Sequence, residues 1–234
     1  MTIRNLRART ALLIALVGFS GLAPEATARI VRGSGGGPPR RPEPPSLAFV
    51  FEGGLAEPLG GQADPFDGRY GYGAGTGYEL GVRLRQHLGD HFAVAPTFHY
   101  VDFGATSGVG DFAQGANLYY EVSTSLFRYG LELQLWLGDR WSPVRPFVFG
   151  GGALAHNRYR DSLQYHGTFS TSMNGPSWTA GFGLKMGVFE LTGAYVGNRF
   201  DTANLAPADV PAGTQHRHNW DYAIIRLGFA FGAY

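Results

Sequence analysis

Residues 222–234 read Tyr-Ala-Ile-Ile-Arg-Leu-Gly-Phe-Ala-Phe-Gly-Ala-Tyr and alternate between two kinds of side chain. Side chains alternate between the two faces of a strand. The broad apolar face consists of Ala223, Ile225, Leu227, Phe229 and Phe231. The opposite face is small apart from one charge and consists of Ile224, Arg226, Gly228, Ala230 and Gly232. Small residues around a charge are typical of the inside of a narrow barrel, so the pattern predicts a strand whose outer face touches lipid.

The same two-faced pattern recurs in seven earlier segments. They cover residues 47–56, 77–86, 92–103, 128–137, a segment beginning near Val144, 178–185 and 189–195. In the fifth segment Phe147 and Phe149 stand beside Val148, and we place the phenylalanines on the lipid side. The chain has 36 glycines and 14% aromatic residues, a composition typical of many strands and turns. We therefore predict an all-β fold, an eight-stranded antiparallel up-and-down transmembrane β-barrel over residues 46–234.

The predicted connections alternate in length. Tight turns are expected at 89–90, 139–142 and 187–188, and long polar loops at 57–76, 104–117, 156–176 and 199–219. This alternation is typical of outer-membrane barrels, whose long loops face the outside of the cell. Pro96 lies inside a predicted strand and lacks an N–H group, so we expect a β-bulge there.

One turn fixes a register. A two-residue loop at Gly187-Val188 fits a type II′ hairpin. It pairs Met186 with Phe189, Lys185 with Glu190, Leu184 with Leu191 and Gly183 with Thr192. Each pair joins two apolar residues or two small or polar residues, whereas a one-residue shift of register would pair apolar with polar residues. We expect Lys185 and Glu190 to face each other inside the barrel.

The N-terminal residues predict export. Three arginines precede a short apolar run, and Ala26-Thr27-Ala28 is a small-x-small cleavage site, so residues 1–28 are predicted to be a cleaved signal peptide. Residues 29–45, rich in Pro, Gly and Arg, predict a flexible tether. Cleavage leaves 16 basic and 17 acidic residues, a balance that gives nucleic-acid binding no electrostatic support. The chain has no cysteine, which excludes disulfides and a lipoprotein anchor.

Charged residues recur on the inward faces. The predicted lumenal charge network consists of Glu52, Glu79, Arg83, Arg85, Arg128, Glu132, Lys185, Glu190 and Arg226, with His99 and Gln134 beside them. Acids and bases nearly balance, as expected of an ion-pair network that fills a lumen too narrow for bulk water. A gated ion path is the alternative interpretation.

Other polar and aromatic groups give weaker signals. The segment 156–176 contains His156, His166, Ser170 and Ser172 without a tight His-x-Ser pair, so we predict no catalytic site. His216 and His218 with Asp221 are interpreted as solvent-facing, and neither metal nor cofactor is expected. The aromatics Tyr119, Tyr120, Trp178, Trp220 and Tyr222 are interpreted as an interfacial girdle.

The strand pattern and the aromatic-ended last strand, residues 227–234, resemble the small eight-stranded outer-membrane β-barrel family of the OmpA/OmpX type. The resemblance implies a bacterial outer-membrane protein that is monomeric and surrounded by lipid and lipopolysaccharide. It also implies that the barrel-assembly machinery reads the terminal aromatics, here Phe229, Phe231 or Tyr234.

Architecture says little about activity. We expect a structural, envelope-stabilising role or interactions made by the loops. The alternatives are a channel for small solutes or apolar ligands and, with less support, an enzyme acting on lipid A. In a soluble lipocalin-like barrel the apolar face would point inward. The solvent-exposed face would then consist of glycine and alanine.

Overall fold

The computed structural model describes residues 47–60, 74–112, 116–139, 141–165, 167–200 and 218–233. These residues all belong to one compact unit, Pro42–Tyr234. The predicted signal peptide (1–28), the tether (29–45) and Tyr234 lie outside the described residues. No helix in the described part of the chain is long and apolar enough to cross a membrane.

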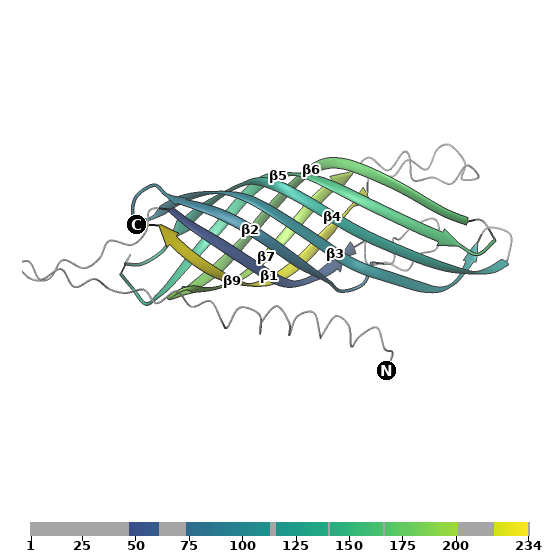
Figure 1. Ribbon diagram of the computed structural model, residues 1–234, viewed down its shortest axis with the longest axis horizontal. Helices are drawn as coiled ribbons and strands as arrows, with labels where there is room; N and C mark the ends of the chain where they lie inside the picture. Colours follow the sequence, from purple (N-terminus) through teal and green to yellow (C-terminus); the bar gives the residue numbers. More distant parts are fainter. Residues whose placement is uncertain are drawn as a thin grey trace, which may run out of the picture. The chain divides into compact units, whose positions relative to one another are not determined.

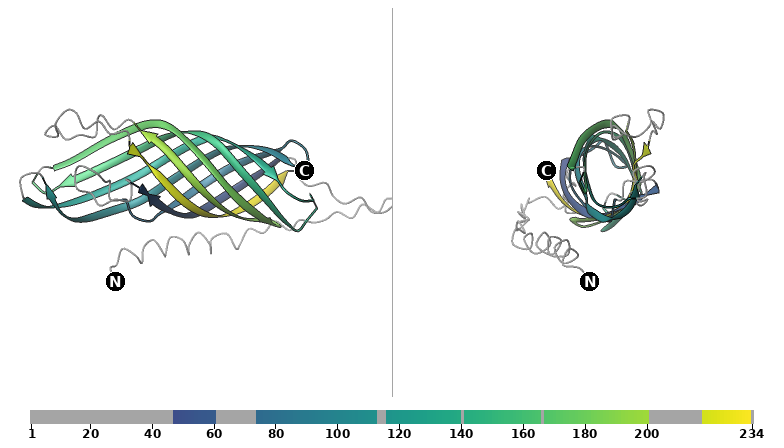
Figure 2. Two further views of the ribbon diagram at one scale, coloured as in Figure 1. Left: turned by 180° about the vertical axis from the view of Figure 1, so that it is seen from behind. Right: turned by 90° about the vertical axis from the view of Figure 1, so that its right-hand side faces the viewer.

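The described chain is almost entirely β-strand. The strands are β1 (Leu47–Leu59), β2 (Gly77–His87), β3 (Phe92–Phe112), β4 (Ala116–Trp136), β5 (Val144–Leu163), β6 (Gly167–Met186), β7 (Phe189–Phe200), the two-residue β8 (His218–Asn219) and β9 (Asp221–Ala233). Neighbours pair antiparallel from β1 to β7, and β9 pairs with both β7 and β1. This closes an eight-stranded antiparallel barrel, seen as a ring in the right-hand view of Figure 2, and confirms the predicted fold.

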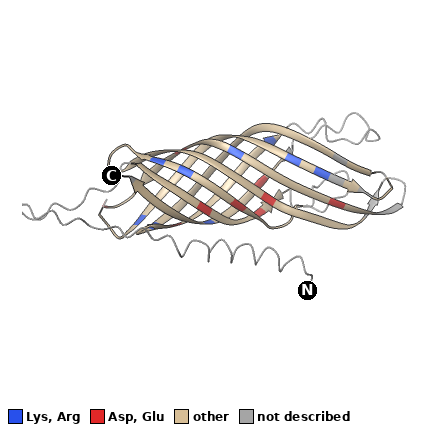
Figure 3. Ribbon diagram, in the orientation of Figure 1, with Lys and Arg blue, Asp and Glu red and all other residues tan. Residues whose placement is uncertain are grey.

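The alternation of residues separates the lumen from the outer wall. In β9, Ile225 is 66% and Leu227 46% exposed, whereas Arg226 between them is 1% exposed. The same division holds in β4, where Leu131 and Leu133 point outward and Glu132 is buried. Charged positions of both signs lie along the barrel strands (Figure 3). The wall therefore has an apolar exterior and a charged interior, as the sequence predicts.

The two ends of the barrel differ. The tight connections β2–β3, β4–β5 and β6–β7 lie at one end, with the C-terminal end of β9, and we call this the turn end (Figure 1). At the opposite hairpin end, β3 and β4 continue to Phe112 and Ala116, and β5 and β6 to Leu163 and Gly167. The predicted loops 104–117 and 156–176 are therefore wrong and are mostly strand. The outer faces of these hairpins are polar because they are exposed to solvent. Their composition therefore resembles that of a loop.

The β-bulge predicted at Pro96 is also wrong. Pro96 pairs with Leu131 of β4 without a shift of register. On the β2 side, Arg83 pairs with Thr97 and Gln86 pairs with Val94, and no pair between these two is described. The register is the same before and after the proline, so neither strand has an extra residue there. The register shift in β3 lies between Asp102 and Ala105 instead. Gly104 there has φ of 70°, a conformation that glycine adopts without strain.

The register predicted from the β6–β7 turn is confirmed. Lys185 pairs with Glu190, and Met186 with Phe189. Gly187 has φ of 62°, as the first central residue of a type II′ turn requires.

We expect Gly187→Ala to lower the free energy of unfolding by about 1–2 kcal/mol, because an L side chain is strained at positive φ. Gly152→Ala is the matched control, since an added Cβ there meets no atom within 4 Å. Urea unfolding in lipid vesicles measures the stability of both variants. Equal stability of the two variants would contradict the turn assignment.

Candidate functional site

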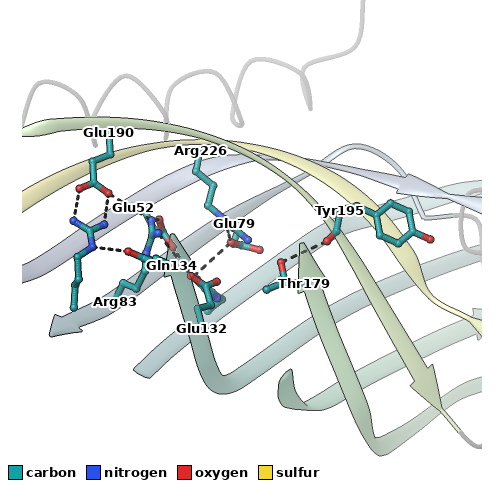
Figure 4. A network of polar contacts seen from close by, with 11 residues as sticks. Glu52, Glu79, Arg83, Glu132, Gln134, Thr179, Glu190, Tyr195 and Arg226 are labelled. Atoms are coloured by element: carbon teal, nitrogen blue, oxygen red, sulfur yellow. Dashed lines mark hydrogen bonds and ion pairs between the residues drawn. The ribbon is translucent and has the colours of Figure 1, made fainter. Parts of the chain in front are cut away.

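The middle of the lumen holds charged side chains from five strands, β1, β2, β4, β7 and β9. Arg83, Arg85 and Glu190 are 0% exposed, so their side chains are fully enclosed by the barrel. The same region holds Glu52, Glu79, Arg128, Glu132 and Arg226, each at most 6% exposed. Figure 4 shows several of these side chains converging from facing walls.

Glu190 is held by a bidentate ion pair with Arg85. Nη1 and Nη2 of Arg85 donate to its two carboxylate oxygens, each at 2.6 Å. Nε of Arg85 also donates to Oε1 of Gln134 at 2.8 Å, which orients the guanidinium. Lys185 faces Glu190 in the ladder and is half-buried. The carboxylate is thus engaged by Arg85, and no ion pair among the described residues includes Lys185.

Arg83 links several carboxylates. Its Nη2 donates to Oε2 of Glu52, whose other oxygen lies 2.6 Å from Nε2 of His99. Nη1 lies 3.7 Å from Glu132, and Nη2 lies 3.9 Å from Glu190. One guanidinium therefore spans three strands, which suits a planar, multi-donor cation.

A third group joins β9 to β2 and β4. Nε of Arg226 donates to Oε1 of Glu79 at 2.5 Å, and Tyr222 Oη donates to Oε2 of the same carboxylate at 3.1 Å. Nη1 of Arg128 donates to Tyr222 Oη at 3.2 Å, and its Nε donates to Ser177 Oγ at 2.9 Å. Tyr222 thus bridges an arginine and a glutamate.

The assignment of Tyr222 to an interfacial girdle is wrong, because its side chain is 0% exposed inside the barrel. Trp220 and Tyr120 are buried as well, whereas Tyr119 and Trp178 do point outward, at 47% and 43% exposure. The period-two count from Arg226 back to Ile224 and Tyr222 places all three on the inner face. The aromatic type of a side chain is a weaker signal than that count.

We expect Tyr222→Phe to lower the free energy of unfolding by about 1.5–3 kcal/mol, the usual loss for a hydrogen bond to a charged group. The ring stays packed while the hydroxyl that joins Arg128 to Glu79 is removed. Tyr129→Phe, on the outward face of β4, is the control and should leave stability unchanged. An unaffected Tyr222→Phe barrel would show that the bridge contributes nothing.

Aromatic side chains close the lumen on the turn side of the charges. Trp136 and Phe147 stack at 4.4 Å between ring centroids. The Arg85 guanidinium lies 4.7 Å from the centroid of the Trp136 ring, and that of Arg145 lies 5.1 Å from it. Cation–π contacts of this kind hold the guanidiniums in place. The aromatic rings therefore pack directly against the charged residues.

The expected lipid-facing orientation of Phe147 and Phe149 on β5 is wrong. They are 1% and 5% exposed inside the barrel, and Val148 points outward at 43%. The partners across the ladder are Gly183 and Gly181, where a Cβ would clash with these same rings. Glycine on β6 makes the space that the phenylalanines fill, and no single segment reveals this complementarity.

An apolar cluster closes the lumen toward the hairpin end. Its buried members include Phe103, Leu126, Tyr159, Met173, Phe200 and Trp220. Phe200 and Trp220 meet edge to face, with centroids 5.6 Å apart. The charged middle therefore lies between two apolar layers.

Glu52, Glu79 and His99 have ligand atoms within 4.8 Å of one another and form the one metal-like cluster among the described residues. Each carboxylate already has an arginine partner, Arg83 for Glu52 and Arg226 for Glu79. These guanidiniums repel a cation at the same point. The cluster therefore serves better as part of the ion-pair network than as a metal site.

The remaining sequence candidates that the structure describes lie on the outer wall. His156 Nδ1 is 2.7 Å from Asn174 Oδ1, and Ser170 and Ser172 face outward on β6. Asp221 pairs with Arg199 at 3.1 Å and accepts from Tyr195 at 2.6 Å. His166, His216 and the side chain of His218 lie outside the described residues.

Two of the terminal aromatics are described and both lie on the outer wall. Phe229 and Phe231 have ring centroids 4.5 Å apart. Phe229 also meets Phe189 at 5.3 Å, and Phe231 meets Phe51 at 6.0 Å. The last strand therefore ends in an outward aromatic cluster that it shares with its two neighbours.

The closed barrel with an apolar exterior and a charged interior has the fold of the small eight-stranded outer-membrane β-barrels. The attachment invasion locus protein Ail of Yersinia pestis, solved with the heparin analogue sucrose octasulfate, is similar over 80% of this chain and 99% of its own, with a TM-score of 0.51 and 11% identity. A major outer membrane protein from Thermus thermophilus is similar over 79% of this chain and 99% of its own, with a TM-score of 0.51 and 12% identity. No protein family and no curated protein sequence matches the chain.

Proposed function

We propose that this protein is an integral β-barrel of the bacterial outer membrane that stabilises the envelope or presents its hairpin end to outside partners, without conducting solutes or catalysing a reaction. The observation that carries the proposal is the filled lumen inside an apolar wall. Arg83, Arg85, Glu190 and Tyr222 are each 0% exposed although they lie where a pore would run. A solute path would need water at these groups.

The apolar exterior supports membrane insertion. Leu80, Leu133, Leu154, Phe182 and Ile225, from five different strands, are each at least half exposed. Such a continuous apolar wall is unfavourable in water and favourable in lipid. Outer-membrane lipid and lipopolysaccharide are the partners this wall would contact.

Assembly and oligomeric state follow from the same architecture. We place the recognition signal for the barrel-assembly machinery at the end of the last strand, in Phe229, Phe231 or Tyr234. A closed barrel has no free strand edge within the membrane, so a monomer is self-sufficient there. The extended β3–β4 and β5–β6 hairpins are the surfaces that an outside partner would meet, and the heparin analogue bound to Ail shows that a barrel of this fold can present a ligand surface.

Membrane fractionation with heat-modifiable gel migration tests this proposal. We expect the chain in the outer-membrane fraction, with faster migration before boiling than after. A deletion strain should show increased sensitivity to detergent and bile salts. Recovery in the soluble fraction, or migration independent of boiling, would contradict the proposed location.

A further inference from the structure

Two arginines lie side by side on the outer wall of β5. Arg158 and Arg160 are both exposed and share one face of the strand. The ladder places Arg158 between Ser125 of β4 and Ser172 of β6. It places Arg160 between Ser123 and Ser170 in the next outward row. Each arginine therefore has a serine beside it on both neighbouring strands.

This pair lies just past the apolar part of the wall. Leu154, 56% exposed, is the last large apolar residue on the outward face of β5 before the arginines. Four residues of strand rise about 13 Å, or about 10 Å along the membrane normal at the usual tilt. The Arg158 guanidinium also lies 5.7 Å from the centroid of the Phe127 ring on β4. The two charges thus stand at the depth of lipid headgroups.

Arg158 and Arg160 belong to no ion pair between residues that the structure describes. The ion pairs among the described residues lie in the lumen or join Arg199 to Asp221. Asp102, two strands away in the Arg158 row, accepts from the hydroxyls of Tyr78 and Tyr100. Glu121 faces Ser162, one row beyond Arg160. The Ser-Arg-Ser rows therefore form a local cationic surface.

We propose that Arg158 and Arg160, with Ser123, Ser125, Ser170 and Ser172, bind the phosphate groups of a phosphorylated lipid in the outer leaflet, such as the lipid A part of lipopolysaccharide. Guanidinium groups bind phosphate through paired, charge-assisted hydrogen bonds, and serine hydroxyls supply further donors. This inference rests on the proposed outer-membrane location and adds a defined lipid site to it.

Native mass spectrometry of the full chain, purified from membranes in detergent, tests the site with bis-phosphorylated lipid A as the probe. The variant R158Q/R160Q should bind this lipid about tenfold or more weakly than wild type, because each surface arginine contributes about 1 kcal/mol toward anionic lipid. R199Q is the matched control, since Arg199 is an exposed arginine already paired with Asp221. It should bind lipid A as wild type does.

Two further arms identify the ligand. Dephosphorylated lipid A should bind wild type as weakly as bis-phosphorylated lipid A binds R158Q/R160Q. Inorganic phosphate at millimolar concentration should not displace lipid A, and displacement would indicate a site for free phosphate instead. Equal binding by wild type and R158Q/R160Q would overturn the inference. All variants should keep heat-modifiable migration. Failure of the wild type to insert into the membrane would refute the proposed function. An inserted barrel that binds phosphorylated and dephosphorylated lipid A equally would refute only this site.

Discussion

Replacing Glu190 with alanine is expected to lower the free energy of unfolding by about 3–5 kcal/mol, the usual cost of breaking a buried ion pair. The variant leaves the Arg85 guanidinium, 0% exposed, without its two 2.6 Å hydrogen bonds to carboxylate. It also removes the carboxylate 3.9 Å from Arg83. Urea titration of the barrel in phospholipid vesicles, followed by heat-modifiable gel migration, measures the change.

The double variant Glu190→Leu/Arg85→Leu provides the control. Replacing both members of a buried pair with apolar residues is often neutral or stabilising. We therefore expect the double variant to be more stable than Glu190→Ala. If Glu190→Ala unfolds at the wild-type urea concentration, the lumenal pair makes no contribution and the proposed role of the network is wrong.

Replacing Trp136 with alanine is expected to cost about 3–5 kcal/mol, as for other large aromatic residues removed from a packed core. The ring is 1% exposed and stacks on Phe147 at 4.4 Å. Its loss also frees the guanidiniums of Arg85 and Arg145 from their cation–π contacts. The same urea titration with gel readout is suitable, because it does not depend on tryptophan fluorescence.

Trp178→Ala is the matched control, a tryptophan on the outer wall at 43% exposure. It meets Tyr195 at 5.1 Å between ring centroids, so its removal should cost about 1 kcal/mol, the size of one aromatic pair. A larger loss for Trp178→Ala than for Trp136→Ala would mean that the lipid-facing wall, not the lumenal layer, carries the stability.

Much of the fold could be predicted because alternation and turn chemistry are local signals. The contrast between apolar Ile225 and charged Arg226 identifies the two faces of the last strand without any information about the neighbouring strands. The Gly187-Val188 turn likewise fixes the β6–β7 register from a few residues. Lys185 does face Glu190 in the ladder, but the ion pair of Glu190 is with Arg85, which depends on strands far apart in sequence.

What could not be predicted depends on the partner strand or on the solvent. Phe147 and Phe149 face inward because Gly183 and Gly181 lie opposite, and single-strand patterns do not contain that information. The extended hairpins of β3–β4 and β5–β6 have polar outer faces that resemble loops. Pro96 is accommodated by a gap in one ladder, which only the register of both neighbours shows.

Conductance in planar lipid bilayers shows whether the lumen is filled by its own side chains. The full-length barrel, with insertion verified by heat-modifiable migration, should produce no stable current steps at any voltage that the bilayer tolerates. The charged residues and the apolar clusters on either side of them are buried, so we expect no continuous water path through the lumen. Reproducible single-channel steps with an ion-selective reversal potential would contradict the account and favour the channel.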